Sequence, residues 1–415
     1  MTAPALTRGQ SWALVLAATF TMTISYIDRQ ALAVLAPTIT RELRLSETQY
    51  GLLASAFSLA YLIGAPLAGR WIDRVGARRG LLAAVLVWTV ASALHALAPG
   101  FGALVVFRVL LGFAESPSFP GASQTVHRAL PPGDRPRGVG VLFTGSSIGS
   151  MIAPPIAVAL MGVFGWRGAL LVSALSGLVW VPLWMGVAWR SPGREVLDAA
   201  PEAEVVAAGS AAWSAWREPA VVRTLALIVG SSPAIGFVLT WSAKYLVRAW
   251  GVTQVGVAAF IWLPPLLFDA GSVAFGDLSA RLARHPSNPR GGTHPALVAL
   301  SSTLAAGATL AMVGATSPWM AMGFAGAAMF GGGGTYAMIT SDMLARIPAR
   351  GVSTAGGWCA SAQALAFVVA NPLIGRGVEA YGGYRQVLVA LAAWMAPWAV
   401  AWLAWPGVRA ARARG

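Results

Sequence analysis

Two charged residues stand side by side in an apolar stretch near the start of the chain, in the segment SYIDRQAL. Asp28 and Arg29 lie inside a run from Trp12 to Pro37 that is long enough to cross a lipid bilayer. An Asp or an Arg at mid-membrane costs about 2.5–3.5 kcal/mol, so such residues are retained chiefly where they serve a site or a pathway. Because Asp is too short to reach the membrane surface, we predict that the pair lines a water-filled cavity.

Helical spacing predicts that the side chains of Asp28 and Arg29 point in different directions from the helix. Tyr26 and Arg29 are three residues apart and share one face of a helix. The planar guanidinium of Arg29 can bind a carboxylate through two parallel hydrogen bonds, and the Tyr26 hydroxyl can add another. Asp28 lies about 100° around the helix and is expected to face a neighbouring helix. We predict that Arg29 and Tyr26 bind the carboxylate end of a substrate.

A second charged pair occurs in the segment RVLLGFAE, where Arg108 and Glu115 are seven residues apart and face the same way. Arg108 is expected at the depth of Asp28, so we predict that these two form an ion pair. Burial favours proton binding by a carboxylate and a nearby Arg opposes it, which makes Asp28, Glu115 and Arg108 the predicted proton-coupling residues. A structural alternative stays open, in which Arg108 only forms an ion pair and Glu115 bonds to Ser116 or Ser118.

The composition indicates which elements must hold these side chains. Of the 415 residues, 57% are hydrophobic and 11% are charged, with a mean hydropathy of +0.66, unlike a soluble domain. Apolar runs of about 20 residues, the length of one membrane helix, recur along the chain. We predict an all-α polytopic membrane protein with twelve transmembrane helices, at residues 11–37, 48–69, 80–98, 101–126, 136–161, 167–189, 220–245, 253–279, 295–314, 317–342, 352–375 and 384–405.

The distribution of basic residues explains the formal net charge of +14. Of the 29 Lys and Arg residues, 20 lie in the termini and in the segments after even-numbered helices, and 7 lie on the other side. The positive-inside rule therefore predicts that both termini are cytoplasmic. Since the excess reflects topology, we expect the lipid bilayer and a small anionic substrate as partners, no nucleic acid, and a monomer.

The longest hydrophilic stretch, at residues 190–218, falls at the midpoint of the chain and holds five of its 15 acidic residues. We predict that it is a cytoplasmic linker. It would join an N-terminal six-helix bundle at 1–189 to a C-terminal six-helix bundle at 219–415. Two tryptophans within 205–217 suggest a short helix at the lipid boundary.

The two halves carry a faint repeat in the loop that follows the second helix of each, AGRWIDRVGARRG and FGDLSARLARHPS. At an offset of 207 residues, Gly69 matches Gly276 and Arg74 matches Arg281, whereas Asp73 has no acidic counterpart. Twelve helices in two related halves are typical of a large class of secondary transporters.

The first of these loops, GRWIDRVGARR, resembles the signature loop of the major facilitator superfamily, and RVLLGFAE resembles its fourth-helix Arg motif. The resemblance implies a mechanical role for the loop, in which arginines and a helix N-terminus hold Asp73 and lock the halves. The residues predicted to act in gating are Gly69, Asp73, Arg74, Gly76, Arg78 and Arg79.

Four further segments resemble the anion–cation symporter family: YIDRQALAVLAPTI, QYGLLASAFSLAY, GFAESPSFPGA and WLPPLLFDAGSVAFG. This family includes hexuronate and galactonate transporters that take up sugar acids with protons, and the resemblance covers nearly the whole chain. It implies that Tyr61 lines the substrate pocket. The chain departs from the family in helix five, which has small serines, and in helix eleven, which supplies only Gln363 and Asn371; both differences would reshape the pocket. The other substrate-binding candidates, each with helix packing as the alternative, are Ser146, Ser147, Trp241, Trp262, Gln363 and Asn371. Lys244 and Asp269 are left without an assigned role.

The sequence favours proton-coupled symport of an organic anion, most simply a hexuronate or aldonate, by alternating access in a bacterial-type inner membrane. A proton-coupled exporter of drugs or metabolites is the alternative. Such exporters usually carry a Gly-Pro-rich fifth helix, whereas this chain has GSSIGSMIAPPIAVALM there. The APP of that helix and the GGGG at 331–334 allow either bending or close helix packing.

An enzyme is not expected, because the sequence has no metal-ligand cluster, nucleophile elbow or phosphate loop. No cofactor is expected either, apart from protons as the coupling ion.

Overall fold

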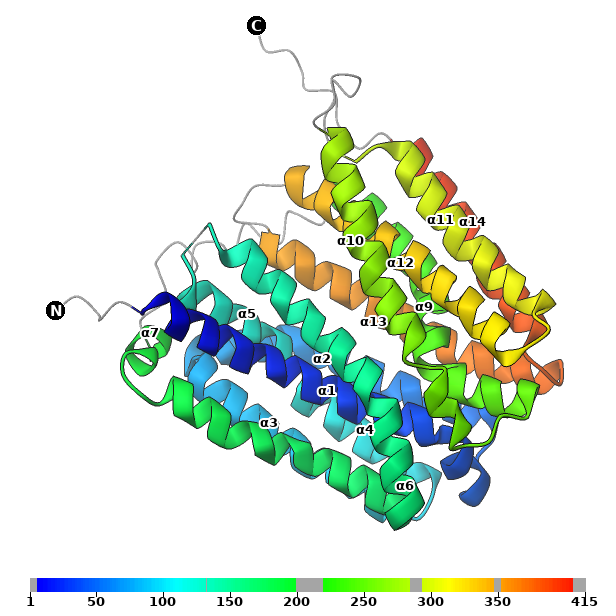
Figure 1. The fold of residues 1–415 in the computed structure, drawn as a ribbon, viewed down its shortest axis with the longest axis horizontal. Coiled ribbons are helices and arrows are strands. Elements are labelled where there is room, and N and C mark those ends of the chain that lie inside the picture. Colours follow the sequence, from blue (N-terminus) through cyan, green and yellow to red (C-terminus); the bar gives the residue numbers. More distant parts are fainter. Residues whose placement is uncertain (1–5, 132, 199–218, 284–292, 347–351, 406–415) are drawn as a thin grey trace, which may run out of the picture. The chain divides into compact units, whose positions relative to one another are not determined.

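The computed structural model describes residues 6–131, 133–198, 219–283, 293–346 and 352–405, and this part of the chain is helical without strands (Figure 1). The N-terminal helices are α1 (Arg8–Glu42), α2 (Glu47–Val75), α3 (Ala77–Leu94), α4 (Phe101–Glu115), α5 (Ser118–Ala129), α6 (Arg135–Ala188) and α7 (Gly193–Asp198). The C-terminal helices are α9 (Pro219–Trp250), α10 (Leu263–Ala283), α11 (Pro295–Ala311), α12 (Pro318–Arg346), α13 (Val352–Ala380) and α14 (Arg385–Ala404).

The chain forms two compact units. The first contains residues 1–201 together with Leu246–Trp262, and the second contains the remainder. The prediction placed Leu246–Trp262 in the C-terminal bundle, but this segment packs with the first unit. There the Gln254 side chain donates to the Val34 carbonyl at 2.7 Å. Most of the predicted linker, including the expected helix at 205–217, lies outside the described residues, and only α7 of it is seen.

Nine helices among the described residues are long and apolar enough to cross a membrane. One of them lies within α6, whose 54 residues would span about 80 Å if straight, far more than the roughly 30 Å of a bilayer core. The helix breaks at Gly165, where φ is +67°, a conformation that favours glycine. The break falls between two of the predicted helices, and the total of twelve stays a prediction.

The predicted transmembrane helix at 101–126 corresponds to one candidate span, Phe101–Ala129. It is interrupted at Ser116 and Pro117, between α4 and α5. Proline has no backbone N–H to continue the helical ladder, although both residues keep right-handed helical φ and ψ. This break directly follows Glu115, so the acidic side chain stands on the last residue of α4.

Three glycines set the close packing of the helices that carry the charged pairs. A Cβ atom at Gly145 or Gly149 of α6 would lie 2.6 or 2.4 Å from a backbone oxygen of α1. A Cβ atom at Gly112 of α4 would lie 2.6 Å from the Phe57 carbonyl oxygen of α2. Backbones this close fix α6 against α1, which carries Arg29, and α4, which carries Glu115, against α2.

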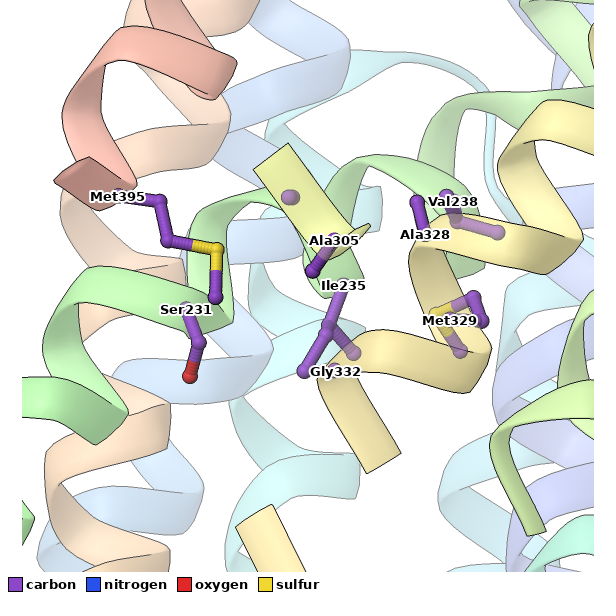
Figure 2. A pocket seen from close by; sticks show the side chains of 9 residues that line it. Ser231, Ile235, Val238, Ala305, Ala328, Met329, Gly332 and Met395 are labelled. Atoms are coloured by element: carbon purple, nitrogen blue, oxygen red, sulfur yellow. The ribbon is translucent and has the colours of Figure 1, made fainter. Parts of the chain in front are cut away.

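The four consecutive glycines of α12 also serve close packing. A Cβ atom at Gly331 would lie 2.5 Å from the Ser301 oxygen of α11, and one at Gly333 would lie 2.1 Å from the Phe268 oxygen of α10. Gly332 is different, because its Cβ would meet only Ile235 at 3.4 Å. Gly332 borders a small cavity of the second unit (Figure 2), whose other lining residues are Ser231, Ala234, Ile235, Val238, Ala305, Ala328, Met329 and Met395.

These contacts predict opposite outcomes for neighbouring substitutions. Gly333→Ala should lower the free energy of unfolding by about 1–3 kcal/mol or more, because the methyl group collides with backbone that cannot move aside. Gly332→Ala should leave stability unchanged or raise it by up to about 1 kcal/mol, since Ala is the better helix former and the methyl group has room. Thermal unfolding of both variants in detergent tests this, and equal losses of stability would contradict the packing described.

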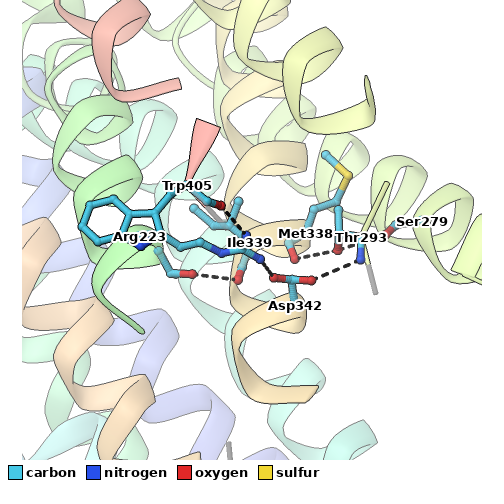
Figure 3. Close-up of polar contacts among 8 residues, drawn as sticks. Arg223, Ser279, Thr293, Met338, Ile339, Asp342 and Trp405 are labelled. Carbon is cyan, nitrogen blue, oxygen red and sulfur yellow. Dashed lines mark hydrogen bonds and ion pairs between the residues drawn. The ribbon is translucent and has the colours of Figure 1, made fainter. Parts of the chain in front are cut away.

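A buried ion pair joins α9 to α12 in the second unit (Figure 3). Arg223 of α9 pairs with Asp342 of α12, and both side chains are almost fully buried. The other oxygen of Asp342 accepts a hydrogen bond from the Thr293 backbone N–H at 3.2 Å, just before α11. The guanidinium also lies over the Trp402 ring of α14 at 4.4 Å. Asp342 therefore ties α9 and α12 to the start of α11.

Replacing Asp342 by Asn is expected to cost about 3–5 kcal/mol of stability, because the buried Arg223 loses its carboxylate. Replacing the pair together by apolar residues, as in Arg223→Met with Asp342→Leu, should recover most of the loss. Asp277→Asn is a matched control, because Asp277 pairs with Arg281 on an exposed surface and such pairs contribute little. A melting temperature of Asp342→Asn equal to that of the control would overturn this assignment.

Candidate substrate and proton site

Arg29 of α1 and Glu115 of α4 form an ion pair inside the first unit. The Arg29 Nε donates to Glu115 Oε2 at 2.6 Å. The same oxygen accepts a hydrogen bond from the Ser25 hydroxyl at 2.7 Å. Glu115 is fully buried, whereas 20% of the Arg29 side chain is exposed. Ser25 lies one helical turn before Arg29, and this spacing could have identified it from the sequence.

The structural alternative for Glu115 is not formed. Ser116 donates its hydroxyl to the Phe113 carbonyl at 2.7 Å instead. The Ser118 hydroxyl has no hydrogen-bond partner among the described residues. Glu115 therefore bonds across to α1 rather than within its own segment.

Three aromatic rings surround the guanidinium of Arg29. Its Cζ lies 5.0 Å from the Tyr26 ring centroid and 4.8 Å from those of Phe57 and Tyr61. Each such contact attracts the cation to the negative face of the ring. Within the described part of the chain, the Nη2 atom of Arg29 has no hydrogen-bond partner. Arg29 is thus oriented by Glu115 and the rings while part of its donor capacity stays unused.

The predicted ion pair between Asp28 and Arg108 is not formed, and this expectation was wrong. Asp28 is buried, and neither of its carboxylate oxygens has a hydrogen-bond partner among the described residues. Ser92 of α3 is near enough to interact with the carboxylate, although it makes no hydrogen bond of normal geometry. Arg108 instead lies over the Phe57 ring of α2 at 5.7 Å. The two charges are near enough to interact electrostatically, but the carboxylate and the guanidinium do not come into direct contact.

Two of the predicted substrate-binding residues meet in the second unit. The Trp241 indole N–H of α9 donates to Asn371 Oδ1 of α13 at 3.0 Å. The Asn371 amide donates in turn to the Phe367 carbonyl at 2.9 Å. Trp241 and Asn371 are both buried. Gln363 lies two helical turns earlier on α13 and is partly exposed. Asn371 therefore fixes the orientation of the Trp241 ring.

The remaining substrate candidates lie in the first unit. Ser146 and Ser147 are partly buried on α6, between the two glycines that contact α1. Tyr61 stacks on Phe57 with ring centroids 6.1 Å apart. Trp262 precedes α10, is 36% exposed, and donates its indole N–H locally to the Ala259 carbonyl at 2.8 Å. The structure thus brings Tyr61 to Arg29 but gives Trp262 a surface position.

The loop after α2 is tied down by Gln124 of α5. The Gln124 amide donates to Asp73 Oδ1 at 3.2 Å, and its oxygen accepts the Ala77 backbone N–H at 2.8 Å. The sequence led us to expect arginines and a helix N-terminus around Asp73. Arg74 and Arg79 are exposed, whereas Arg128 of α5 is near enough to interact with the Asp73 charge. The N-terminus of α3 is joined to Asp73 through Gln124. A glutamine within an amphipathic helix carries no signal that would have identified it. The two glycines predicted to act in gating differ. Gly76 has a φ of +83°, which favours glycine, whereas a Cβ atom at Gly69 would meet open space.

Arg78, another predicted gating residue, forms an ion pair with Asp198 of α7. It donates to both carboxylate oxygens of Asp198, at 2.9 and 2.6 Å. Its guanidinium lies 4.5 Å from the Trp189 ring centroid, and its carbonyl accepts the Trp184 indole N–H at 2.9 Å. Arg78 therefore anchors the start of the linker to the first unit.

The hydrogen bonds from Arg78 lower the pKa of the Asp198 carboxyl. A lowered pKa in the folded state stabilises the protein above the unfolded value, about 3.9, and the contribution disappears as the pH falls through the folded value. Because Asp198 is about one-third exposed, we expect a contribution of only about 0–1 kcal/mol. Asp198→Asn should lower the melting temperature slightly at pH 7, and the difference should shrink as the pH falls below about 3.9. A pH-independent difference would contradict this account.

Among the described residues, no group of three or more His, Cys, Asp or Glu side chains could hold a metal ion. The titratable groups gathered by the fold are instead Asp28, Arg29, Arg108 and Glu115, together with the phenols of Tyr26 and Tyr61. This arrangement can exchange a carboxylate at Arg29 and can accept a proton at a carboxylate.

Comparison with known proteins yields one family. The model of the Major Facilitator Superfamily matches residues 18–358. A galacturonate transporter of Dickeya chrysanthemi is 30% identical over 286 residues, which cover 65% of this chain and 81% of the relative. A hexuronate transporter of Bacillus subtilis is 32% identical over 62% of this chain and 61% of its own length. A hexuronate transporter of Escherichia coli K12 is 27% identical over 85% of this chain and 86% of its own length.

Solved structures support the same fold. The crystal structure of a bacterial homologue of the human lysosomal transporter Spinster, in an inward-facing and unoccupied conformation, matches with a TM-score of 0.81. The match covers 96% of this chain and 97% of that protein at 19% identity. From the family match, the relatives and the apolar helices, it follows that this chain belongs to the Major Facilitator Superfamily and is a multi-pass membrane transporter, not an enzyme.

Proposed function

We propose that the protein takes up a sugar acid of the hexuronate or galacturonate type together with protons. The observation that carries this proposal is the ion pair between Arg29 and the fully buried Glu115, set among aromatic rings. The galacturonate and hexuronate transporters to which the chain is similar point to the same class of anion.

The substrate carboxylate and Glu115 compete for Arg29, and this competition couples binding of the anion to binding of a proton. A substrate carboxylate and the Glu115 carboxylate both fit the guanidinium, and binding of the substrate would release Glu115 from it. A buried carboxylate without its cation takes up a proton. Asp28 is the second proton candidate, because it is buried beside this pair with unbonded oxygens. Binding of one ligand thereby favours the other, as thermodynamic linkage requires.

The other contacts distinguish a sugar acid from a simple carboxylate. The hydroxyl groups of Tyr26 and Tyr61 stand beside Arg29 and can bond to sugar hydroxyls, while their rings pack against sugar C–H groups. Ser146 and Ser147 of α6 can add further hydroxyl contacts. Trp241, Gln363 and Asn371 are the candidates that the second half would contribute.

The loop after α2 serves as the proposed gate. Gln124 joins Asp73 to the start of α3, and Arg78 holds α7. We place the protein in a bacterial inner membrane with both termini in the cytoplasm, because basic residues predominate on that side. The loop would then open and close the cytoplasmic end during alternating access.

Uptake into liposomes tests the function. Purified protein should accumulate labelled D-galacturonate or D-glucuronate when the outside is acidic, and a protonophore should stop the accumulation. Unlabelled sugar acids should compete, whereas neutral galactose should not. Accumulation that does not depend on the pH gradient would refute proton coupling. If the protein transports no sugar acid but moves a hydrophobic cation in exchange for protons, the exporter alternative is favoured.

A further inference from the structure

We propose that Phe57 of α2 is a positioning residue that holds the guanidinium groups of Arg29 and Arg108 in place for transport. Its ring centroid lies 4.8 Å from the Cζ of Arg29 and 5.7 Å from the Cζ of Arg108. The inference rests on the proposed function, because it assigns Phe57 a task in binding the anion. Phe57 carries no sequence signal of its own, since it is one apolar residue in an apolar helix.

The backbone of Phe57 is fixed by the helix that carries Glu115 and Arg108. A Cβ atom at Gly112 of α4 would lie 2.6 Å from the Phe57 carbonyl oxygen, so α2 and α4 are in direct contact at this residue. The Phe57 ring is only 9% exposed. It stacks on Tyr61, one turn further along α2, with an interplanar angle of 24°. The backbone of Phe57 is thus held against α4, and its ring packs against Tyr61.

Hydrogen bonds leave part of both guanidinium groups unpaired. Among the described residues, the Nη2 of Arg29 and the Nε of Arg108 have no hydrogen-bond partner. The ring face is negative and attracts both cations, which otherwise repel each other. When Glu115 gives up Arg29 to a substrate carboxylate, the aromatic contacts are the ones that remain. Phe57 then keeps the guanidinium at the angle that two parallel hydrogen bonds require.

Two variants at position 57 separate the charge distribution of the ring from its shape. Phe57→Leu keeps an apolar side chain and removes the ring. Incorporation of 3,4,5-trifluorophenylalanine at position 57 keeps the ring and weakens its negative face. Phe113→Leu is the matched control, because Phe113 lies on α4 and is 41% exposed. KM and the maximal rate of pH-driven galacturonate uptake are measured for each.

Both Phe57 variants should raise the KM about tenfold, as expected for the loss of roughly 1.4 kcal/mol of cation–π attraction. The maximal rate should stay within about twofold, and Phe113→Leu should match the wild type. An unchanged KM in the trifluorophenylalanine protein would overturn the proposal, whether or not Phe57→Leu is impaired. So would a lower melting temperature of Phe57→Leu with a wild-type KM, because the ring would then only pack.

A second experiment tests the contact between Phe57 and Arg29 without the substrate. The melting temperatures of Phe57→Leu, Arg29→Gln and the double variant form a double-mutant cycle. We expect losses that do not add, because each substitution removes the same contact. Additive losses would overturn the contact. If the wild type transports no sugar acid but the cycle shows coupling, the proposed function fails while the positioning of Arg29 by Phe57 stands.

Discussion

Replacing Arg29 by Ala is expected to abolish sugar-acid binding while the protein still folds. Two charge-assisted hydrogen bonds to a carboxylate contribute about 1.5–3 kcal/mol each, so the affinity should fall at least about 100-fold. Arg29→Lys should fail as well, because an ammonium group cannot bond to both carboxylate oxygens in parallel. Thermal-shift titration with D-galacturonate measures the affinity, since a ligand that binds the folded state raises its stability.

The control for this prediction is Arg41→Ala, which removes an exposed arginine from the same helix. Loss of Arg29 leaves Glu115 buried without its cation, which can destabilise the protein by itself. The double variant Arg29→Ala with Glu115→Gln removes this cost and should also fail to bind. If Arg29→Ala binds galacturonate with the affinity of the Arg41→Ala control, the assignment of Arg29 to the substrate carboxylate is wrong.

Glu115→Gln is expected to separate substrate movement from the proton gradient. Gln resembles the protonated acid and can still accept the hydrogen bond that Ser25 donates to this position. Substrate should bind and exchange across the membrane, because Arg29 no longer has a competing carboxylate. Uphill accumulation driven by pH should be lost, since the proton that balances substrate binding has no site. Counterflow exchange and pH-driven uptake, measured on the same liposomes, distinguish the two activities.

Asp28→Asn is the partner variant in that experiment, because Asp28 is the other buried carboxyl beside Arg29. Its counterflow and its pH-driven uptake show whether coupling needs one carboxylate or both. Concentrative uptake by Glu115→Gln at the wild-type level would contradict the role of Glu115 and reduce it to a packing residue.

The helices could be predicted from the sequence because a long apolar run in lipid can satisfy its backbone hydrogen bonds only by forming a helix. The exact ends could not be predicted, since they depend on local chemistry. Pro117 divides one predicted helix, and the glycine conformation at Gly165 separates two others. Both breaks depend on single residues, which a hydropathy pattern averaged over a window does not show.

The residues of the site could be predicted more readily than their partners. Asp28, Arg29, Arg108 and Glu115 were evident because charge inside an apolar run is costly. Depth along a helix suggested that Asp28 pairs with Arg108, but pairing depends on which helices touch and at what angle. In the structure Glu115 meets Arg29 of α1 instead.

Other residues of the site were missed because their types carry little chemical signal. Phe57 is one of 15 phenylalanines, and its significance comes only from the two guanidinium groups beside it. Gln124 acts through the loop that it holds, and Asp198 was one of several acids in a hydrophilic stretch. Ser25 is the exception, because it lies one turn from Arg29 and could have been included on spacing alone.

The central claim is that a sugar acid displaces Glu115 from Arg29 and thereby draws a proton onto the protein. It is tested most directly by counting the protons that binding takes up. Purified protein in weakly buffered detergent solution near pH 7 is titrated with D-galacturonate while the pH is recorded. The wild type should take up about one proton for each substrate bound, as linkage between the two ligands requires, and Glu115→Gln should bind substrate without taking up a proton. Saturating binding to the wild type with no change in pH, or the same proton uptake by Glu115→Gln, would contradict the account.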